Sequence, residues 1–372
     1  MKKLLAALLA VMMVMSLCAC GSSVDTATLD EIQTSLDTIS GLLDDLSVDA
    51  APAAEAEPAA EAEPAAEAAA ADFSDISANL TMGTGGEAGT YYAFGGVLAS
   101  YISANTGISA NVVSTGGTAA NITGIDQGLY DLATVQSDVS TYAYFGTNSF
   151  EETGAVTSFS VLGALYAETV QIVTCNAELT SVADLAGKNV CVGDVGSGTY
   201  YNSIDVLAAY GMTLDDITPV YQSFGDSTES LKDGKIDAAF ICAGAPTTAV
   251  TDLATSNSVY LISIDDEHMA TLLDSCPWYA SLTIPAGTYS GFDQDAVTIT
   301  VKATLVARAD LDEDVAYAIV STIFENTEAI TELHGKGAEL SVEFATDGIA
   351  VPFNAGAAKY YAEKGITVEV AE

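Results

Sequence analysis

The sequence has very little positive charge. It contains 10 lysine and arginine residues against 51 aspartate and glutamate residues, and neither Lys nor Arg occurs between Lys3 and Lys188. Such a chain is repelled by nucleic acid and by anionic membrane surfaces, which excludes both as partners. The single arginine, Arg308, stands shortly before Asp310 and Asp312. This placement favours a surface ion pair over an arginine clamp for a ligand.

Cysteine and histidine are also scarce, and no CxxC pair occurs beyond the N-terminal segment. The spacing therefore predicts no metal site, no cofactor and no catalytic residue paired with a histidine base. The two histidines, His268 and His334, are expected in surface or capping roles. Four cysteines follow the N-terminal segment, at positions 175, 191, 242 and 276. Buried free thiols are expected there, with a disulfide between Cys175 and Cys191 as the alternative.

Two nucleotide-binding patterns are missing from the glycine-rich turns. No Gly-Lys-Ser/Thr follows any of them, which excludes a P-loop, and Gly83–Ala88 lacks the third glycine of the dinucleotide pattern. What remains is a set of three turns rich in glycine and hydroxyl groups, at 83–92, 114–118 and 196–200. Each leads into a helix-like segment, so free N–H groups and hydroxyls at helix N-termini are predicted to hold a small anion.

The N-terminus carries an export signal. Lys2 and Lys3 precede an uncharged run over 4–15, which is too short to span a membrane. Leu17 and the small residue before Cys20 resemble a lipobox, so residues 1–19 are predicted to be a lipoprotein signal peptide and Cys20 the acylated residue. Acylation at Cys18 and cleavage as an ordinary secretory peptide are the alternatives.

Residues 20–78 are predicted to form a lipid-anchored stalk. Leucines and isoleucines from Leu29 to Leu46 are spaced by three and four, which predicts a short amphipathic helix. Imperfect repeats of Pro-Ala-Ala-Glu-Ala-Glu follow from Pro52, a composition typical of a solvated linker.

Short apolar strands alternate with helical segments from near Asn79 onward, which predicts an α/β fold with two lobes. The expected strands are 80–82, 109–113, 132–136, 161–165, 169–175, 189–192, 218–221, 238–241 and 296–307, and the expected helices 92–104, 119–127, 181–186, 198–210, 227–233 and 313–330. Lobe 1 is predicted over 79–165 with 277–372, and lobe 2 over 166–276. A cleft between such lobes commonly binds a small ligand.

Ordered matches along residues 79–370 resemble the TAXI-type solute receptors of tripartite ATP-independent periplasmic (TRAP) transporters. They include Met82–Gly86 with Gly89–Tyr92, Ser114–Gly117 with Asn121, and Asp131–Asp138. Further matches are Ser181–Lys188, Val192–Thr199, Asp237–Pro246, Ile284–Tyr289 and Val351–Phe353. The resemblance implies a type II periplasmic-binding-protein fold that encloses a small organic acid or amino acid and delivers it to the TRAP permease subunits in the membrane.

The predicted ligand site combines the three turns with neighbouring polar residues. N–H groups near Gly86, Gly117 and Gly198 would hold a carboxylate, Gln136 and Asn121 would donate to a second polar group, and Asp138 would meet an ammonium or cap a helix. The complete set is Gly85, Gly86, Thr90, Tyr91, Tyr92, Ser114, Thr115, Gly116, Gly117, Asn121, Gln136, Ser137, Asp138, Ser197, Gly198, Thr199, Tyr200 and Gly244.

The resulting hypothesis is a receptor without catalytic activity, anchored outside a Gram-positive cell, for glutamate, glutamine or a related dicarboxylic or oxo acid. An ABC-type or sensory solute-binding lipoprotein for another small anion is the alternative, and an enzyme of the same architecture is the rival class.

Overall fold

The computed structural model describes residues 72–371. The predicted signal peptide, Cys20 and the stalk up to residue 71 lie outside these residues. Strand β1 (Phe73–Gly83) begins before Asn79, where the folded part was expected to start. The alternation of small polar residues hid this strand, whose Phe73 ring packs against Tyr317 at 6.1 Å. No helix in this part of the chain has the length and apolar character needed to cross a membrane.

The strands form one mixed sheet in the order β2-β1-β3-β10-β4-β7-β5-β6, with β8 beside β4 and β9 beside β10. After β1 the strands are β2 (Thr106–Val113), β3 (Leu132–Gln136), β4 (Phe159–Thr174), β5 (Asn189–Cys191), β6 (Thr218–Val220), β7 (Ala238–Ala243), β8 (Tyr260–Leu261), β9 (Ala280–Ile284) and β10 (Ala296–Arg308). We call β1 to β3 the first half and β5 to β7 the second half. Each half runs second, first, third strand and then a long shared strand. The predicted type II periplasmic-binding-protein fold is confirmed.

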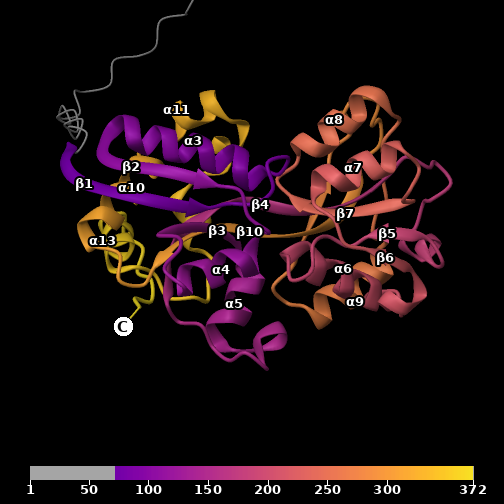
Figure 1. Ribbon diagram of the computed structural model, residues 1–372, viewed down its shortest axis with the longest axis horizontal. Coiled ribbons are helices and arrows are strands. Elements are labelled where there is room, and N and C mark those ends of the chain that lie inside the picture. The colour runs from indigo at the N-terminus through magenta and orange to yellow at the C-terminus, as the bar shows by residue number, and fades with distance from the viewer. Residues whose placement is uncertain (1–71, 372) are drawn as a thin grey trace, which may run out of the picture. The chain divides into compact units, whose positions relative to one another are not determined.

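Helices cover both faces of the sheet (Figure 1). They are α3 (Thr90–Asn105), α4 (Thr118–Asp126), α5 (Ser137–Phe145), α6 (Gly198–Ala209), α7 (Phe224–Lys232), α8 (Thr248–Ser256), α9 (Asp266–Ser275), α10 (Glu313–Phe324), α11 (Thr327–Leu333), α12 (Val342–Thr346) and α13 (Ala355–Glu363). Single turns of 3-10 helix are η1 (Asn148–Phe150), η2 (Val182–Leu185), η3 (Leu214–Asp216) and η4 (Gly335–Glu339).

The hydrophobic core is divided between the halves. One cluster joins β1, β3 and the start of β4 to helices α3, α10 and α13. In the second half, α6 and α9 cover one face of the sheet and α7 and α8 the other, so two clusters form there. Strands β4 and β10 are long enough to belong to both halves, and they connect them through the sheet.

The expectation of two separate strands over 161–165 and 169–175 is wrong, because β4 is continuous from Phe159 to Thr174. Glu168 is a polar residue in the gap between the two expected strands. In the folded chain its side chain is buried, and its Oε2 accepts a hydrogen bond from the Tyr91 hydroxyl at 2.7 Å. A carboxyl group with one oxygen held by a hydroxyl donor can therefore occupy a buried strand.

The single helix expected over 313–330 is also wrong, because the chain ends α10 at Phe324 and starts α11 at Thr327. Asn326 leaves the helical conformation, and its Nδ2 donates to the Thr322 carbonyl at 2.9 Å. Asparagine competes for backbone groups in this way and favours helix ends.

Two other predicted helices differ from the observed ones. Over the predicted helix 181–186 the chain forms only η2, and α7 begins at Phe224, before the expected residue 227.

Replacement of Gly356 by alanine is expected to destabilise the fold by about 1 to 3 kcal/mol through overpacking. A Cβ atom there would lie 2.0 Å from the Glu313 carbonyl oxygen and 2.7 Å from the Tyr317 nitrogen, where α13 crosses α10. Urea unfolding measures the change. Gly96→Ala is the control, because nothing lies within 4 Å of that position in α3 and the helix should gain about 0.5 to 1 kcal/mol. Equal stability of the two variants would contradict the expected clash.

Candidate functional site

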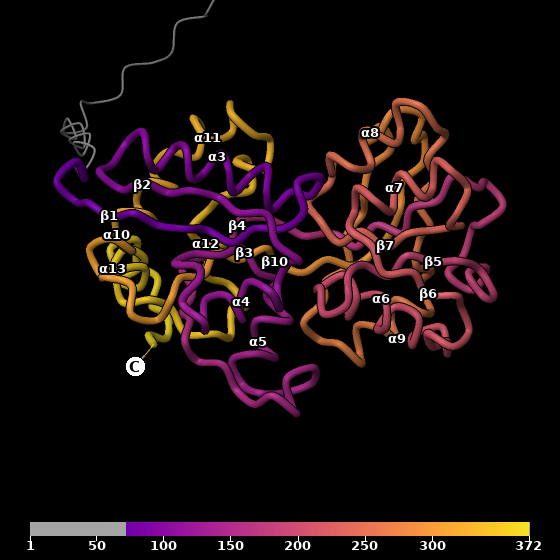
Figure 2. The backbone as a smooth tube through the Cα atoms, in the orientation of Figure 1, coloured from indigo at the N-terminus to yellow at the C-terminus, as the bar shows by residue number. Residues whose placement is uncertain are grey.

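A pocket lies where the two halves meet, and four helices begin at its wall. Helices α3 and α4 come from the first half, and α6 and α7 from the second (Figure 2). The space between the lining residues is about 600 Å³, the open mouth included. The lining residues are Gly85, Gly86, Gly89, Thr90, Tyr91, Thr115, Gly116, Gly117, Thr118, Gln136, Glu168, Asp194, Ser197, Gly198, Thr199, Ser223, Phe224, Cys242 and Ala243.

The first-half wall consists of two turns that hydrogen bonds hold together. The Ser114 hydroxyl donates to the Gly85 carbonyl at 3.0 Å, and the Thr115 hydroxyl donates to the Thr84 carbonyl at 2.9 Å. The Gly117 N–H in turn donates to Thr115 Oγ1 at 3.1 Å. These hydroxyls are therefore used within the wall, so the backbone N–H groups are its main donors toward a ligand.

Helices α3 and α4 begin without side-chain caps. Their N-cap residues are Gly89 and Gly117, and neither can offer an oxygen to the first helical N–H groups. The N-termini of α6 and α7 differ, because Ser197 Oγ accepts from the Tyr200 N–H and Ser223 Oγ from the Asp226 N–H, both at 3.2 Å. The uncapped donors of α3 and α4, together with the helix dipoles, make the first-half wall suited to an anion.

The second-half wall meets the first through Gly198. A Cβ atom at this position would lie 1.0 Å from the Gln136 amide oxygen of the first half. Gln136 Nε2 also donates to Asn202 Oδ1 at 2.9 Å and to the Cys242 sulfur at 3.3 Å. The absence of a side chain at Gly198 is what allows the two walls to come this close.

Two acidic residues line the pocket, whereas none of the described lining residues is Lys, Arg or His. Burial, and secondarily the charge of Asp138, raises the pKa of Glu168 well above its usual range. Burial, and secondarily the charge of Asp226, also raises the pKa of Asp194. The pocket thus combines neutral donors for an anion with a buried acidic group.

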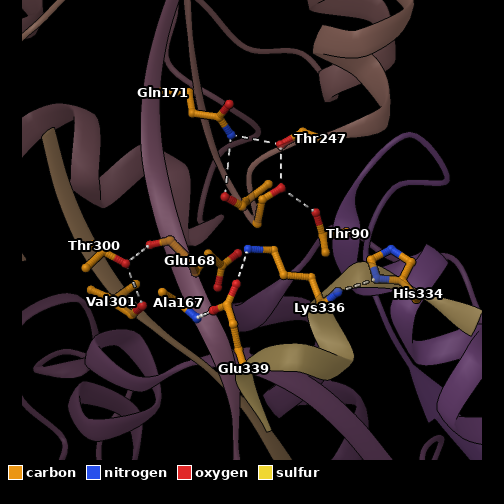
Figure 3. Close-up of polar contacts among 12 residues, drawn as sticks. Thr90, Ala167, Glu168, Gln171, Thr247, Thr300, Val301, His334, Lys336 and Glu339 are labelled. Carbon is orange, nitrogen blue, oxygen red and sulfur yellow. Dashed lines mark hydrogen bonds and ion pairs between the residues drawn. The ribbon is translucent and has the colours of Figure 1, made fainter. Parts of the chain in front are cut away.

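One cation lies behind the pocket wall, close to Glu168 (Figure 3). Lys336 Nζ makes an ion pair with Glu339 Oε1 at 2.5 Å and lies 5.5 Å from the centre of the Tyr166 ring. Glu339 Oε2 also accepts from the Ala167 N–H at 2.7 Å. The positive charge of Lys336 is therefore balanced by a carboxylate of its own segment.

Eleven of the residues predicted for the site line this pocket: Gly85, Gly86, Thr90, Tyr91, Thr115, Gly116, Gly117, Gln136, Ser197, Gly198 and Thr199. Seven others do not: Tyr92, Ser114, Asn121, Ser137, Asp138, Tyr200 and Gly244. Asn121 is fully buried and bonds the Thr84 and Thr134 carbonyls at 2.6 and 2.7 Å. Its amide therefore holds the first-half wall together from behind.

The remaining residues outside the lining have contacts of their own. Ser137 Oγ accepts from the Lys302 N–H, and the Gly244 carbonyl accepts from the Thr90 and Thr247 hydroxyls. Tyr200 packs against the rings of Tyr201 and Tyr221, and Tyr92 is half-buried on α3. The hydroxyl groups and aromatic rings of these residues thus contribute to packing and hydrogen bonding around the pocket without lining it.

Asp138 lies in a buried polar network between the halves. Its Oδ2 accepts from Asn202 Nδ2 at 3.2 Å, while its buried Oδ1 lacks a partner among the described residues. Asn202 Nδ2 also donates to the Tyr279 hydroxyl at 2.9 Å, and that hydroxyl donates to Asp205 Oδ2 at 2.7 Å. Burial raises the pKa of Asp138 to about 7. Asp138 follows the first residue of α5 and is not its cap, since the N-cap position is Gln136.

Sequence reasoning missed eight lining residues: Gly89, Thr118, Glu168, Asp194, Ser223, Phe224, Cys242 and Ala243. Gly89 and Thr118 belong to the glycine-rich turns that were singled out, and Asp194 lies in the Val192–Thr199 match, so their position was a usable signal. Ser223 carries the N-cap signal of α7, which begins earlier than predicted. Glu168, Cys242 and Ala243 lie on buried strands, where no local pattern distinguishes a pocket residue from a core residue.

The arginine, histidine and cysteine residues of the described part of the chain have the following contacts. Arg308 forms ion pairs with Asp310 at 2.7 Å, as predicted, and with Asp131 at 3.2 Å. His334 caps η4 by accepting from the Lys336 N–H, and His268 stacks on Tyr210 at 3.6 Å. All four cysteines of this part are free thiols. Within residues 72–371 no group of three His, Cys, Asp or Glu residues is arranged to hold a metal ion.

The sequence profile of the NMT1-like family matches residues 82–365. Among solved structures, the putative L-cystine ABC transporter from Listeria monocytogenes is 14% identical, covers 71% of this chain and 98% of that chain, and has a TM-score of 0.46. The alkanesulfonate-binding protein from Xanthomonas axonopodis pv. citri bound to MOPS is 16% identical over 79% and 96%, with a TM-score of 0.45. The GluR0 ligand-binding core from Nostoc punctiforme in complex with L-glutamate is 14% identical over 70% and 100%, with a TM-score of 0.42.

Proposed function

Because the chain belongs to the NMT1-like family, which it matches over residues 82–365, we propose that it is an extracytoplasmic receptor for a small carboxylated solute. The solute is captured between two lobes and delivered to a membrane permease. The observation that supports this most directly is the pocket at the junction of the halves, with the uncapped N-termini of α3 and α4 in its wall.

The binding step follows from the chemistry of this wall. A carboxylate at the first turns of α3 and α4 receives hydrogen bonds from backbone N–H groups and lies at the positive ends of both helix dipoles. Each hydrogen bond to a charged group contributes roughly 1.5 to 3 kcal/mol. Several such bonds together offset part of the cost of immobilising the solute.

Capture between lobes requires that the halves move relative to one another. We assign residues 79–165 with 277–372 to lobe 1 and 166–276 to lobe 2, with β4 and β10 as the connecting strands. Bonds that cross the pocket, such as Tyr91 to Glu168 at 2.7 Å and Thr90 to the Gly244 carbonyl at 3.0 Å, belong to the closed arrangement. Closure then buries the solute and offers one shape to the permease.

The proposal assigns no chemical step to the pocket. Its lining offers no histidine base, and burial raises the pKa of the Cys242 thiol well above its usual range, which disfavours a nucleophilic thiolate. Thr199 Oγ1 accepts from the Cys242 N–H at 3.4 Å and so serves the wall. Binding without conversion of the solute is the function that these groups support.

We assign the receptor to the TAXI type of TRAP transporter on the ordered sequence matches over residues 79–370, and its lipid anchor to Cys20 on the lipobox. Copurification with membranes that contain candidate permeases tests this assignment. Recovery of a TRAP permease is expected, and a fused TRAP permease gene next to the receptor gene would agree with it. Recovery of an ABC permease with its ATPase would favour the ABC-type alternative.

A calorimetric screen of the full chain tests solute binding itself. Glutamate, glutamine, dicarboxylates and oxo acids are the candidates, and at least one is expected to bind at a 1:1 ratio with a dissociation constant near the micromolar range. The solute recovered afterwards should be unchanged. Binding confined to sugars or to cations without a carboxylate would contradict the carboxylate proposal, and conversion of the solute would contradict the absence of catalysis.

A further inference from the structure

We infer that Glu168 determines which solutes the pocket accepts, by pairing through Oε1 with an ammonium group that the solute carries in addition to its carboxylate. This inference rests on the proposed function and narrows it, because simple dicarboxylates and oxo acids lack such a group.

The position of Glu168 within the pocket is the first argument. Its side chain is only 3% exposed, yet it lines the pocket near the middle of β4. Oε2 accepts from the Tyr91 hydroxyl, whereas Oε1 makes no hydrogen bond to any residue of the described chain. Oε1 is therefore the carboxyl oxygen that remains available to a ligand in the pocket.

The charges around Glu168 are the second argument. Lys336 is the closest cation, but its ammonium is paired with Glu339 and makes no ion pair with Glu168. The other titratable groups that influence the Glu168 carboxyl are Asp138 on α5, Tyr91 on α3, Tyr166 on β4 and Cys242 on β7, and none of them supplies positive charge. The charge of Lys336 lowers the pKa of Glu168 without pairing with its carboxyl, so among the described groups none brings a positive charge into direct contact with Oε1, and an ammonium from the solute would do so.

A proton balance follows from this arrangement. Burial keeps the Glu168 carboxyl protonated to a higher pH than usual, and an ammonium at Oε1 favours the ionised form. The solute keeps its ammonium proton, Glu168 passes its own proton to the solvent, and an ion pair forms. Binding should therefore release up to one proton per solute and become tighter as the pH rises through the range in which Glu168 ionises.

The assignment replaces Asp138 as the partner of an ammonium. Asp138 lies outside the pocket lining, and its Oδ2 is engaged by Asn202. Glu168 faces the space that Asp138 does not reach. The two ends of a zwitterionic solute then have separate sites, with the carboxylate at the turns before α3 and α4 and the ammonium at Glu168.

Calorimetry on the full chain tests this inference with matched pairs of probes: L-glutamate against glutarate, L-glutamine against glutaramate, and L-alanine against propanoate. At least one amino acid is expected to bind about 10- to 100-fold more tightly than its deaminated partner. Titrations in phosphate and in Tris, whose ionisation enthalpies differ, should show proton release for the amino acid only.

Two variants sharpen the test. Glu168→Gln should abolish both the preference and the proton release, while Glu267→Gln, which makes the same change at an exposed residue of α9 outside the pocket lining, should leave both unchanged. Equal or tighter binding of the deaminated acids by the unmodified chain would overturn the inference without affecting the proposed function. Retention of the preference by the Glu168→Gln variant would overturn it as well, and a chain that binds none of the six probes would contradict both proposals.

Discussion

Alanine at position 198 is expected to weaken solute binding by about 10- to 100-fold. Overpacking of a well-packed contact costs typically 1 to 3 kcal/mol, and 1.4 kcal/mol is a factor of ten in affinity. The new methyl group would occupy the place of the Gln136 side chain, 1.0 Å from its amide oxygen, so the two walls of the pocket would be held apart. Calorimetry with the best solute of the screen measures the loss.

Because Gly198 lies against Gln136, a substitution there is expected to weaken binding by steric conflict as well as by charge. A carboxylate introduced as Gly198→Asp would repel an anion, but steric conflict with Gln136 arises with any side chain. Alanine isolates the steric contribution because it brings no charge.

A double-variant cycle separates this clash from the loss of a glycine as such. In a Gln136→Ala background the space is free, so adding Gly198→Ala should weaken binding no further. Gly96→Ala, in an uncrowded part of α3, should leave affinity unchanged. An unaltered affinity of the Gly198→Ala variant would show that the contact between Gly198 and Gln136 does not form in the solute-bound protein.

Asparagine at position 138 is expected to reduce the loss of stability that the unmodified chain shows between about pH 4 and pH 7. Burial raises the pKa of Asp138 from the ordinary value of 3.8 to about 7 in the folded chain. A raised pKa contributes stability that is complete below pH 3.8 and is lost as the pH rises through 7. With 1.36 kcal/mol per pKa unit, the loss is at most about 4 kcal/mol.

Thermal unfolding at pH 4.5 and pH 8 checks this prediction. The difference in stability between Asp138→Asn and the unmodified chain should move in favour of the variant at the higher pH. An amide that lacks one partner adds a cost that is independent of pH, so only the change between the two pH values counts. Asp274→Asn, at an exposed residue of α9, is the control. Parallel pH profiles for Asp138→Asn and the unmodified chain would contradict a raised pKa.

Much of the fold could be predicted because local patterns and tertiary structure agree. The apolar run of β3 was placed at its observed bounds, 132–136, and the start of α6 at Gly198 follows from the N-cap Ser197. Three of the helix starts at the pocket were found in the same way, since glycine and hydroxyl residues before an apolar periodic segment indicate a helix N-terminus. The walls of the site were thus accessible from the sequence.

The base of the site was not accessible, because its residues depend on contacts between distant segments. Glu168 meets Tyr91, which lies 77 positions away, and Lys336 reaches the same region from the C-terminal part of the chain. The continuous strand β4 also depends on this contact, because the Tyr91 hydroxyl satisfies the carboxyl of Glu168 in the middle of the strand. Asn121 was predicted to contact the ligand, whereas its amide hydrogen-bonds two carbonyl groups of the wall and does not line the pocket.

The lack of positively charged residues in the pocket lining has a kinetic consequence. Backbone dipoles act over a few ångströms, so they hold an anion that has arrived but do not attract one from solution. The chain as a whole carries 51 acidic residues against 10 basic residues, and its field opposes the approach of any net anion. Association of a dicarboxylate should therefore accelerate as salt screens this field, whereas a solute with no net charge should arrive at a rate that hardly depends on ionic strength.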